Sequence, residues 1–387
     1  MASSSEYARL TADPSRSFFL FGVRGTGKST WSRKALPGAY VVDLLDERRH
    51  QELLANPGHL ALELGDLTAG SFVVLDEVQR VPALLNEVHR LIETRKLRFA
   101  LLGSSARKLR AAGTNLLAGR ALHKAMHPLT PKEMGRDFDL GGALRFGTLP
   151  IVVSAEDQRA VLESYVHLYV RQEIQAEALV RSLPGFVRFL PVAALFHGQV
   201  VNVSGLARDA GVARSTVEGY LEILEDTLLT IRLPAFEARL RARERRHPKL
   251  FWVDPGLVRS AKRQLGPVAV EEQGPLFEGL VLHLLRAHGE EQELYEEIVY
   301  WASAQAQATE VDFLLRRGRE YLAIEVKSQE RFAMSMAAGL KAIDDLAGVV
   351  RRILVYSGPR SLKTEDGIEV WPFERFAATV ASGGLWP

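Results

Sequence analysis

A glycine-rich segment that ends in lysine and serine is the part of this sequence whose residue types point most directly to chemistry. It follows an apolar run and has the pattern G-x-x-x-x-G-K-S from Gly22 to Ser29. Glycines let backbone N–H groups approach an anion closely, lysine reaches the β- and γ-phosphates of a nucleotide, and the serine hydroxyl can ligate Mg²⁺. The segment therefore predicts a phosphate-binding loop, made of Gly22, Gly25, Thr26, Gly27, Lys28, Ser29 and Thr30.

The residues on either side of this loop predict the elements that position it. Phe18 to Phe21 form an apolar strand that leads into the loop, and Thr30 to Lys34 begin a helix whose N-terminal dipole faces the phosphates. A chance glycine turn before a helix is the alternative, and the strand and the helix together argue against it. We therefore expect a nucleotide to bind here.

Two adjacent carboxylates lie near the end of a second apolar run, which extends from Ser71 to Gln79. In a strand of the Walker B type the first acid, Asp76, holds Mg²⁺ directly or through water. The second acid, Glu77, orients and deprotonates the attacking water. A strand that merely ends in solvated acids is the alternative, and the upstream loop argues against it. The pair predicts metal-assisted hydrolysis of the bound nucleotide, with Glu77 as the general base.

A third apolar strand, Arg98 to Leu102, is followed by a glycine and two serines. Small hydroxyl groups at the carboxyl end of a strand lie where open α/β sheets bind ligands, so Ser104 or Ser105 is a candidate sensor of the γ-phosphate. Cations that can stabilise transition-state charge, also in a neighbouring subunit, follow at Arg107, Arg110 and Arg120. We favour Arg120, and a solvated arginine is the alternative for each.

The composition is that of an ordinary globular protein, because 47% of the 387 residues are hydrophobic and 25% are charged. Apolar runs stay short of the roughly 20 residues that span a bilayer, so no membrane helix is expected.

The absence of cysteine excludes disulfides and thiolate chemistry, and we expect a cytoplasmic protein. The first 16 residues predict a short flexible leader rather than a secretion signal. A net charge of +2 does not by itself argue for nucleic acid.

Residues 200–234 predict two helices joined through Ala210 and Gly211 and followed by an apolar strand. This is the spacing of a helix-turn-helix with a wing, and Ser204 is the expected cap of the first helix. The N-terminal end of the second helix would meet base edges or phosphates, and the residues there are Arg214, Ser215 and Thr216.

Basic residues crowd the segment that follows, at Arg239, Arg241, Arg243, Arg245, Arg246, His247 and Lys249. The cluster is either an electrostatic footprint for nucleic acid or a solvated hairpin tip. In the first case the expected DNA contacts are Arg243, Arg245 and Arg246. Winged helices also serve as protein-packing modules, and the second helix carries few cations, so a protein partner is the alternative to DNA.

The C-terminal part predicts an amphipathic helix, Pro275 to His288, which carries Glu278 near its start. Three strands follow, over residues 298–301, 310–315 and 321–326. A two-residue turn at Gly318 and Arg319 fixes the pairing of the last two strands, because Arg317 then pairs with Glu320.

This register places Asp312 opposite Glu325, and Glu310 opposite Lys327. Strand alternation puts these four side chains on one face, and the residues of the other, apolar face are Val311, Phe313, Ile324 and Val326. Two acids and a lysine gathered in this way can hold a divalent ion and activate water for phosphodiester hydrolysis. Alternating charges on a solvated strand give the same pattern and are the alternative.

The order of the N-terminal motifs resembles the AAA-type subset of P-loop ATPases. More narrowly, GVRGTGKS, VVLDEVQ, LLGSSARKL and LAGR followed by HPLTPKE look like a large, poorly characterised bacterial and archaeal ATPase family. Its members carry a C-terminal domain of unknown function, and the resemblance extends through most of the chain. It implies ATP, Mg²⁺ and a homo-oligomer such as a hexameric ring.

The C-terminal pattern of an acid followed by E-x-K resembles the PD-(D/E)-x-K nuclease fold. The resemblance implies that Glu278 is the helix-borne acid and that it forms the metal site together with Asp312, Glu325 and Lys327. Folds of this type often persist as binding modules, so cleavage is a separate question from the fold.

Together these patterns predict an α/β protein with four parts. They are a P-loop AAA-type ATPase core at residues 1–140, a helical connector or lid at 141–195, a winged helix-turn-helix at 196–250, and an α/β restriction-nuclease-like domain at 251–387. The leading hypothesis is an oligomeric, ATP-hydrolysing motor or remodeller that handles DNA, with branched DNA as compatible as linear duplex. One alternative is an ATP-gated, metal-dependent DNA nuclease, and another is a signalling or scaffold ATPase that binds protein partners.

Overall fold

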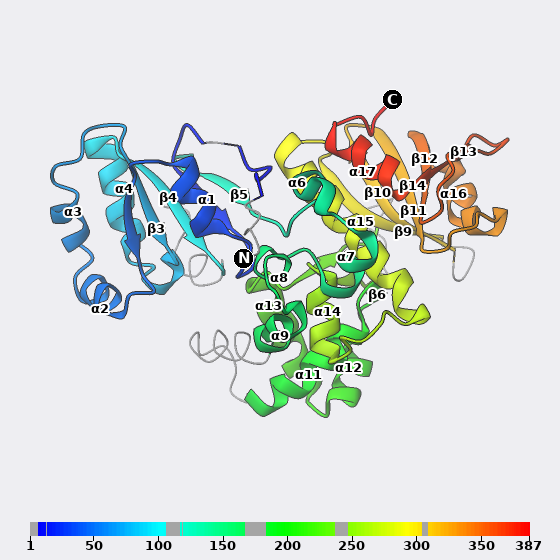
Figure 1. Ribbon diagram of the computed structural model, residues 1–387, viewed down its shortest axis with the longest axis horizontal. Helices are drawn as coiled ribbons and strands as arrows, with labels where there is room; N and C mark the ends of the chain where they lie inside the picture. The colour runs from blue at the N-terminus through cyan, green and yellow to red at the C-terminus, as the bar shows by residue number, and fades with distance from the viewer. Residues whose placement is uncertain are drawn as a thin grey trace. The chain divides into compact units, whose positions relative to one another are not determined.

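The computed structural model describes residues 7–12, 14–105, 117, 119–166, 183–236, 247–303 and 309–387 (Figure 1). By their contacts the residues form two compact units. The N-terminal unit consists of Ala8–His127 with Asp226–Leu229, and the C-terminal unit of Met1–Tyr7, Pro128–Glu225 and Thr230–Pro387. The boundaries that the sequence suggested at residues 140, 195 and 250 all lie within the C-terminal unit.

The N-terminal unit is built on a five-stranded parallel sheet with the strand order β2-β3-β4-β1-β5. The strands are β1 Phe18–Phe21, β2 Tyr40–Asp43, β3 Phe72–Asp76, β4 Arg98–Gly103 and β5 Leu122–Ala125. The helices are α1 Lys28–Ala35, α2 Glu47–Ala55, α3 His59–Glu63 and α4 Leu84–Arg95, with a 3₁₀ turn, η1, at Val78–Arg80. Parallel strands need crossover connections, and helices supply several of them here.

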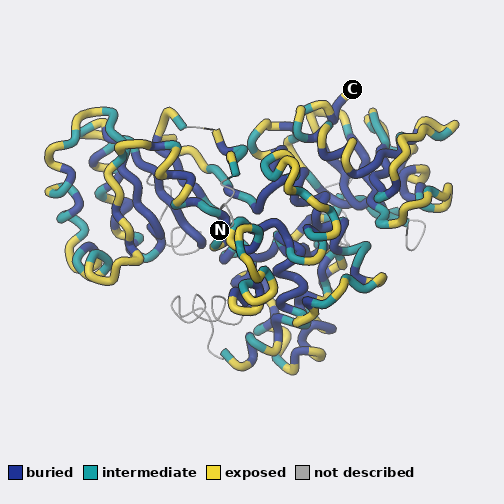
Figure 2. The backbone as a smooth tube through the Cα atoms, viewed as in Figure 1, coloured by how far each residue is buried: buried dark blue, intermediate teal, exposed yellow. Residues whose placement is uncertain are grey.

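Apolar side chains fill both faces of this sheet, so its inner strands are continuous apolar runs rather than alternating ones. On one face Phe19 and Leu101 pack with residues of α2, α3 and α4. On the other face Phe18 packs with Trp31 of α1. Figure 2 shows these strands as buried backbone. The order β3-β4-β1 places the carboxyl ends of these three strands side by side, and the predicted nucleotide motifs follow them.

The first part of the C-terminal unit is helical. Its helices are α6 Pro131–Met134, α7 Leu140–Phe146, α8 Pro150–Val153, α9 Gln158–Ser164 and α11 Leu183–Leu195, with a 3₁₀ turn, η3, at Gly135–Asp137. A later helix, α14 Pro255–Lys262, packs against α7, α9 and α11. Of the predicted connector helix, residues 167–182 lie outside the described residues. Among the helices that are described, none is long and apolar enough to cross a membrane.

Helices and short antiparallel strands alternate in the middle of the chain. α11 leads to β6 Gln199–Val200, then to α12 Val203–Ala210 and α13 Arg214–Asp226, and then to β7 Thr230–Leu233 and β8 Lys249–Trp252, with the sheet order β6-β8-β7. Asn202, rather than the expected Ser204, caps α12, because its side chain accepts the N–H of Gly205. Gly211 ends α12 with φ 63°, a left-handed conformation that glycine adopts without strain.

A six-stranded mixed sheet forms the last part of the chain, with the order β13-β14-β12-β11-β10-β9. The strands are β9 Glu297–Ala302, β10 Glu310–Arg317, β11 Glu320–Lys327, β12 Val349–Tyr356, β13 Leu362–Lys363 and β14 Glu369–Pro372. On one face lie α15 Val270–Gln292 and α17 Phe373–Ala381. On the other lie η5 Met334–Ala337, α16 Ala338–Ala342 and η6 Ile343–Asp345.

The hairpin between β10 and β11 has the predicted turn and register. Arg317 pairs with Glu320 across the turn, and the pairing continues to Phe313 and Ile324. Gly318 has φ 62°, a value that such a turn requires and that glycine tolerates. The prediction from the turn residues is therefore confirmed for this stretch.

The start of β10 departs from simple alternation. A bulge lies between Val311 and Leu314 in the pairing of β10 with β9. Val311 consequently packs with Leu314 on the α16 face, whereas Phe313 packs on the α15 face. The prediction that Val311 and Phe313 share a face is wrong, because a bulge adds one residue to the strand and changes the side on which the preceding residues lie.

Candidate functional site

The glycine-rich loop takes a backbone conformation that only small residues allow. Gly25 and Gly27 have φ values of 84° and 86°, in the region where other residues are strained. A Cβ atom at Gly22 would lie 2.4 Å from the carbonyl oxygen of Met126, so a larger residue does not fit there. α1 begins directly after Gly27, and its first N–H groups therefore open toward the loop. This geometry suits the phosphates of a nucleotide.

Two side chains of the loop bond back onto its own backbone. The buried Lys28 donates from Nζ to the carbonyl oxygen of Gly22 at 2.7 Å. Thr26 donates from its hydroxyl to the carbonyl oxygen of Val23 at 2.9 Å. Thr30, in the first turn of α1, is exposed. The Lys28 ammonium therefore lies against the loop whose N–H groups would hold the phosphates.

The start of α1 brings Ser29 close to the buried carboxylate of Asp76 at the end of β3. Burial raises the pKa of Asp76, and the nearby Ser29 hydroxyl and the charge of Lys28 offset only part of this effect. Hydroxyl and carboxylate oxygens are the hard ligands that Mg²⁺ prefers. The pair therefore fits a Mg²⁺ ion that binds together with ATP.

The carboxylate of Glu77 is held by two polar side chains from the turn after β3 and the end of β4. Its Oε2 accepts a hydrogen bond from the hydroxyl of Ser104 at 2.9 Å and another from the side-chain amide of Gln79. Gln79 also donates to Ser104 at 3.0 Å, and all three side chains are buried. Glu77 has φ 57°, an uncommon conformation for a residue with a side chain. These contacts set the direction of the predicted general base.

Ser104 therefore contacts the predicted base, whereas the sequence suggested a contact with the γ-phosphate. Gln79 was not among the predicted site residues, although it ends the motif VVLDEVQ. A 3₁₀ turn directly after Glu77 brings it back onto the carboxylate. A polar residue in such a short turn gives no periodic signal that the sequence pattern could reveal.

We expect Ser104→Ala to lower kcat for ATP hydrolysis about tenfold or more and to change KM for ATP by less than about twofold. A hydrogen bond to a charged group is worth about 1.5–3 kcal/mol, and about 1.4 kcal/mol corresponds to tenfold in rate. The loss should fall on kcat because the Ser104 hydroxyl contacts Glu77. Phosphate release measured over a range of ATP concentrations separates the two constants. Ser104→Thr, which keeps the hydroxyl, is the matched control, and an alanine variant with unchanged kcat would contradict a positioning role.

Arg120 lies at the surface of the N-terminal unit. Its Nε donates to Oε1 of Glu93 on α4 at 2.5 Å, in an ion pair that is exposed. This hydrogen bond lowers the pKa of Glu93. The other two candidate cations, Arg107 and Arg110, lie outside the described residues. The action of Arg120 on a neighbouring subunit stays a prediction.

An arginine ahead of β1 contacts the glycine-rich loop. Arg9 donates from Nη1 to the carbonyl oxygen of Thr26, and from Nη2 to the carbonyl oxygen of His127 at 2.6 Å. It thereby ties the loop to the segment after β5. The prediction of a flexible leader is wrong at Arg9, and a single arginine in a polar segment offers no sequence signal for this contact.

The predicted nucleic-acid residues are described only in part. Arg214, Ser215 and Thr216 form the first turn of α13, and the side chain of Arg214 is 68% exposed. Its Nε lies 4.0 Å from the carboxylate of Glu218, one turn along the helix. The other predicted contacts, Arg243, Arg245 and Arg246, lie outside the described residues.

Charged side chains from four elements gather in what we call the carboxylate cluster. Its members are Glu278 of α15, Glu310 and Asp312 of β10, Glu325 and Lys327 of β11, and Lys249 of β8. The structure thus brings together the four residues that the sequence suggested for a metal site. Lys249 was expected in an exposed basic segment, and this expectation is wrong because its side chain is only 2% exposed.

Two acids of the cluster, Glu278 and Glu325, have raised pKa values. Burial and the neighbouring Asp312 raise the pKa of Glu278, and the same two causes raise the pKa of Glu325 to about 8. Lys327 donates to Oε1 of Glu325 at 2.5 Å, and Oε2 of Glu325 is buried without a hydrogen-bond partner among the described residues. Within the described ranges no three His, Asp or Glu side chains form a group that could hold a metal ion. The role of Glu278, Asp312, Glu325 and Lys327 as metal-site residues stays a prediction.

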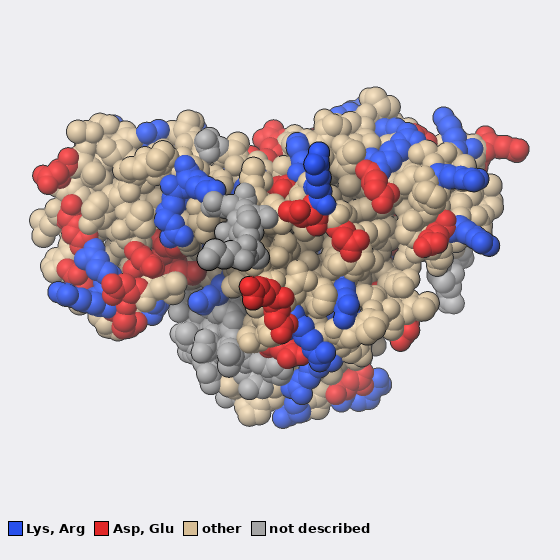
Figure 3. All heavy atoms as spheres, in the orientation of Figure 1, with Lys and Arg blue, Asp and Glu red and all other residues tan. Residues whose placement is uncertain are grey.

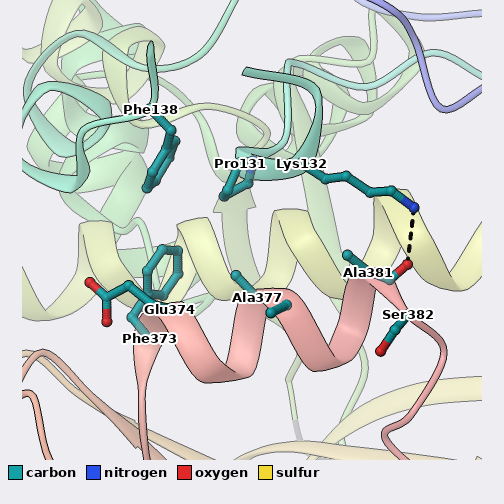
Figure 4. Close-up of a pocket in the computed structure, with 9 residues that line it drawn as sticks. Pro131, Lys132, Phe138, Phe373, Glu374, Ala377, Ala381 and Ser382 are labelled. Atoms are coloured by element: carbon teal, nitrogen blue, oxygen red, sulfur yellow. Dashed lines mark hydrogen bonds between the residues drawn. The ribbon is translucent and has the colours of Figure 1, made fainter. Parts of the chain in front are cut away.

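A cavity of about 440 Å³ lies between α6 and α17 (Figure 4). Phe138 and Phe373 stack beside it with ring centroids 5.9 Å apart. Lys132 donates from Nζ to the carbonyl oxygen of Ala381 at 3.2 Å. No member of the carboxylate cluster lines this cavity. The cavity is therefore separate from the carboxylate cluster.

Three protein families match consecutive parts of the chain. Residues 14–135 match a family described as an AAA domain. Residues 138–267 and 273–376 match two families that are each described as a domain of unknown function, DUF8612 and DUF4143.

Relatives with similar sequences are uncharacterized proteins. One from Mycobacterium tuberculosis is 28% identical over 373 residues, which cover 93% of this chain and 80% of the relative. One from Haemophilus influenzae is 25% identical over 321 residues, which cover 77% of this chain and 75% of the relative.

Solved structures similar to parts of the chain include the ORC2 protein of Aeropyrum pernix and a STAND protein of Pyrococcus horikoshii. The first has a TM-score of 0.34 and 12% identity over 66% of this chain and 89% of that chain. The second has a TM-score of 0.24 and 14% identity over 75% of this chain and 49% of that chain.

The family match over residues 14–135 agrees with the parallel sheet and the motifs described above, and the N-terminal unit is therefore an AAA-type P-loop ATPase domain.

Proposed function

We propose that this protein hydrolyses ATP with Mg²⁺ and couples the hydrolysis to work on DNA. One observation carries the first part. The Lys28 ammonium, the Glu77 carboxylate held by Ser104, and the neighbouring Ser29 and Asp76 lie at one edge of the sheet. In this proposal Lys28 and the loop N–H groups bind the phosphates, while Ser29 and Asp76 hold the metal. Mg²⁺, when bound, neutralises charge on the phosphate oxygens.

Glu77 supplies the proton transfer in this scheme. Its carboxylate takes a proton from the attacking water, and a carboxylate that is already oriented need not be ordered during the reaction. Ser104 and Gln79 supply that orientation, because both donate to the same Glu77 oxygen. We assign Ser104 and Gln79 as positioning residues.

The middle of the C-terminal unit supports the DNA-handling part of the proposal. The order α11, β6, α12, α13, β7 and β8, with β8 between β6 and β7, is the order of elements in a winged helix. In such modules the N-terminal end of the second helix of the pair meets the major groove, and here that end carries the exposed Arg214. On the face shown in Figure 3, Lys and Arg side chains are interspersed with Asp and Glu side chains. Local contacts rather than a large basic surface must therefore carry binding on that face.

Replacing Arg214 with glutamate should weaken duplex DNA binding about tenfold or more and make binding less dependent on salt. Each phosphate contact contributes about −0.9 to the slope of log K against the logarithm of the salt concentration, so losing one contact makes the slope shallower. Fluorescence anisotropy of a labelled duplex over a series of KCl concentrations measures both quantities. Arg159→Glu on α9, also exposed and paired one turn away with Glu163, is the matched control. Equal affinity and slope for Arg214→Glu and wild type would remove α13 from the DNA-binding surface.

A protein partner for the same module is the second candidate. Glu218 and Glu222 are exposed on α13, where they would repel a phosphate backbone. These acids favour a partner with a basic surface. Wild-type protein that binds no DNA form, and whose ATP hydrolysis ignores DNA, would favour this candidate.

We also propose that the protein acts as a homo-oligomer in which Arg120 of one subunit reaches the ATP of the next. The exposed position of Arg120 supports this arrangement, because an arginine supplied in trans can stabilise the charge that develops on the transferred phosphoryl group. A hydrolysis rate per subunit that stays constant over about a hundredfold dilution would contradict it.

A further inference from the structure

We infer that the Lys249 ammonium takes the place of a divalent cation in the carboxylate cluster, so that the cluster is complete without metal and does not cleave phosphodiesters. The inference concerns only the C-terminal unit and does not depend on ATP hydrolysis. It separates two of the functions that the sequence left open, because a metal-dependent nuclease needs the position that Lys249 fills.

The first argument is the position of the ammonium group. Nζ of Lys249 lies 3.1 Å from an oxygen of Glu310, 3.3 Å from an oxygen of Glu278 and 3.5 Å from an oxygen of Asp312. An ammonium group has three N–H donors, which equals the number of carboxylates around it. A metal ion bound by the same oxygens would need distances of roughly 2.0–2.6 Å to them. Such an ion would therefore have to displace the ammonium.

The second argument is the charge that burial requires. The side chains of Asp312 and Glu278 are 7% and 15% exposed, whereas that of Glu310 is 42% exposed. Buried carboxylates repel one another and lose their hydration, so Asp312 and Glu278 need a compensating cation. The Lys249 side chain is 2% exposed. Its ammonium lies within 3.5 Å of a carboxylate oxygen of Glu278, of Glu310 and of Asp312. Lys249 thus supplies from the chain itself the positive charge that a metal would otherwise bring.

The third argument is that Asp312 and Glu325 also have partners within the chain. The second oxygen of Asp312 accepts the backbone N–H of Val326 at 2.8 Å. Lys327 pairs with one oxygen of Glu325. The other oxygen of Glu325 is fully buried and has no hydrogen-bond partner in the described part of the chain.

The fourth argument is that the backbone around Lys249 is fixed. Lys249 belongs to β8, which pairs with both β6 and β7 and lies outside the six-stranded sheet. Its Nζ lies 5.4 Å from the centre of the Tyr300 ring, and the Tyr300 hydroxyl donates to the carbonyl oxygen of His247 at 2.7 Å. The lysine is therefore supplied by a neighbouring sheet and joins that sheet to the C-terminal one.

The test counts Mn²⁺ ions bound to the full-length protein by electron paramagnetic resonance of the free ion, without nucleotide. All proteins carry Asp76→Asn, which removes the acid proposed to hold metal at the ATP site. With Lys249 present, Glu278→Gln should leave Mn²⁺ binding unchanged. Lys249→Met should create a Mn²⁺ site whose affinity is at least about tenfold higher than that of any Mn²⁺ site in the protein that retains Lys249. The double variant Lys249→Met, Glu278→Gln should lack this new site.

A Mn²⁺ site in the protein with Lys249 that Glu278→Gln removes would overturn the inference. Circular dichroism shows whether Lys249→Met folds. If it does not fold, Mn²⁺ binding by the proteins with and without Glu278→Gln, both of which retain Lys249, still tests the inference. Cleavage provides a second readout on otherwise unmodified protein. Metal-dependent cutting of plasmid DNA that Glu325→Ala abolishes would also overturn the inference, and absence of such cutting supports it.

Discussion

Glu77→Gln should lower ATP hydrolysis by about 10²- to 10⁴-fold, because a positioned general base contributes a factor of that size. ATP should still bind, since glutamine has nearly the same shape as glutamate and the phosphate-binding groups are unchanged. The glutamine can still accept from Ser104, whose hydroxyl lies 2.9 Å from the Glu77 carboxylate. The expected product is therefore a folded protein that holds ATP without cleaving it.

Steady-state phosphate release and equilibrium binding of a fluorescent ATP analogue measure the two effects separately. Glu87→Gln is the matched control, because Glu87 lies on α4 of the same unit and pairs only with surface Arg90 among the described contacts. A Glu77→Gln protein that retains more than about a tenth of the wild-type rate would show that another group serves as the base.

Lys28→Ala should abolish hydrolysis and also weaken ATP binding by about 10- to 100-fold. The size follows from the loss of a charged hydrogen-bond donor to the phosphates, worth about 1.5–3 kcal/mol. Nζ of Lys28 is already placed at the loop, 2.7 Å from the carbonyl oxygen of Gly22. Titration with the same fluorescent analogue measures the affinity.

Lys34→Ala, in the last turn of α1, is the control for removing a lysine from the same helix. Circular dichroism must show that Lys28→Ala remains folded, because Lys28 also bonds the loop backbone. A folded Lys28→Ala protein with wild-type affinity for the analogue would contradict the assignment of the loop as the phosphate site.

The nucleotide motifs could be predicted because their chemistry is local in sequence. The eight residues from Gly22 to Ser29 contain the turn, the cation and the hydroxyl, and a buried parallel sheet needs apolar strands that the sequence displays directly. The hairpin at Gly318 was predictable for the same reason, since a two-residue turn determines which residues pair. In each case the residues that interact are close together or belong to one regular element.

The features that the sequence did not reveal depend on contacts between distant residues. Lys249 lies among basic residues in the sequence, and nothing there indicates that its ammonium is buried against Glu278 and Glu310. The bulge that moves Val311 to the other face arises from pairing with β9 and has no local signature. Arg9 reaches the carbonyl oxygens of Thr26 and His127 across the fold, so no spacing rule predicts it.

Steady-state ATP hydrolysis with Mg²⁺, measured without nucleic acid and with single-stranded, duplex and four-way branched DNA, tests the central claim most directly. Glu77→Gln protein serves as the blank for contaminating ATPases. We expect the wild-type protein to hydrolyse ATP and at least one DNA form to increase the rate. The Glu77→Gln blank should show no hydrolysis. Hydrolysis at the same rate with every DNA form would contradict coupling to DNA, and equal rates for wild type and blank would contradict the ATP site itself.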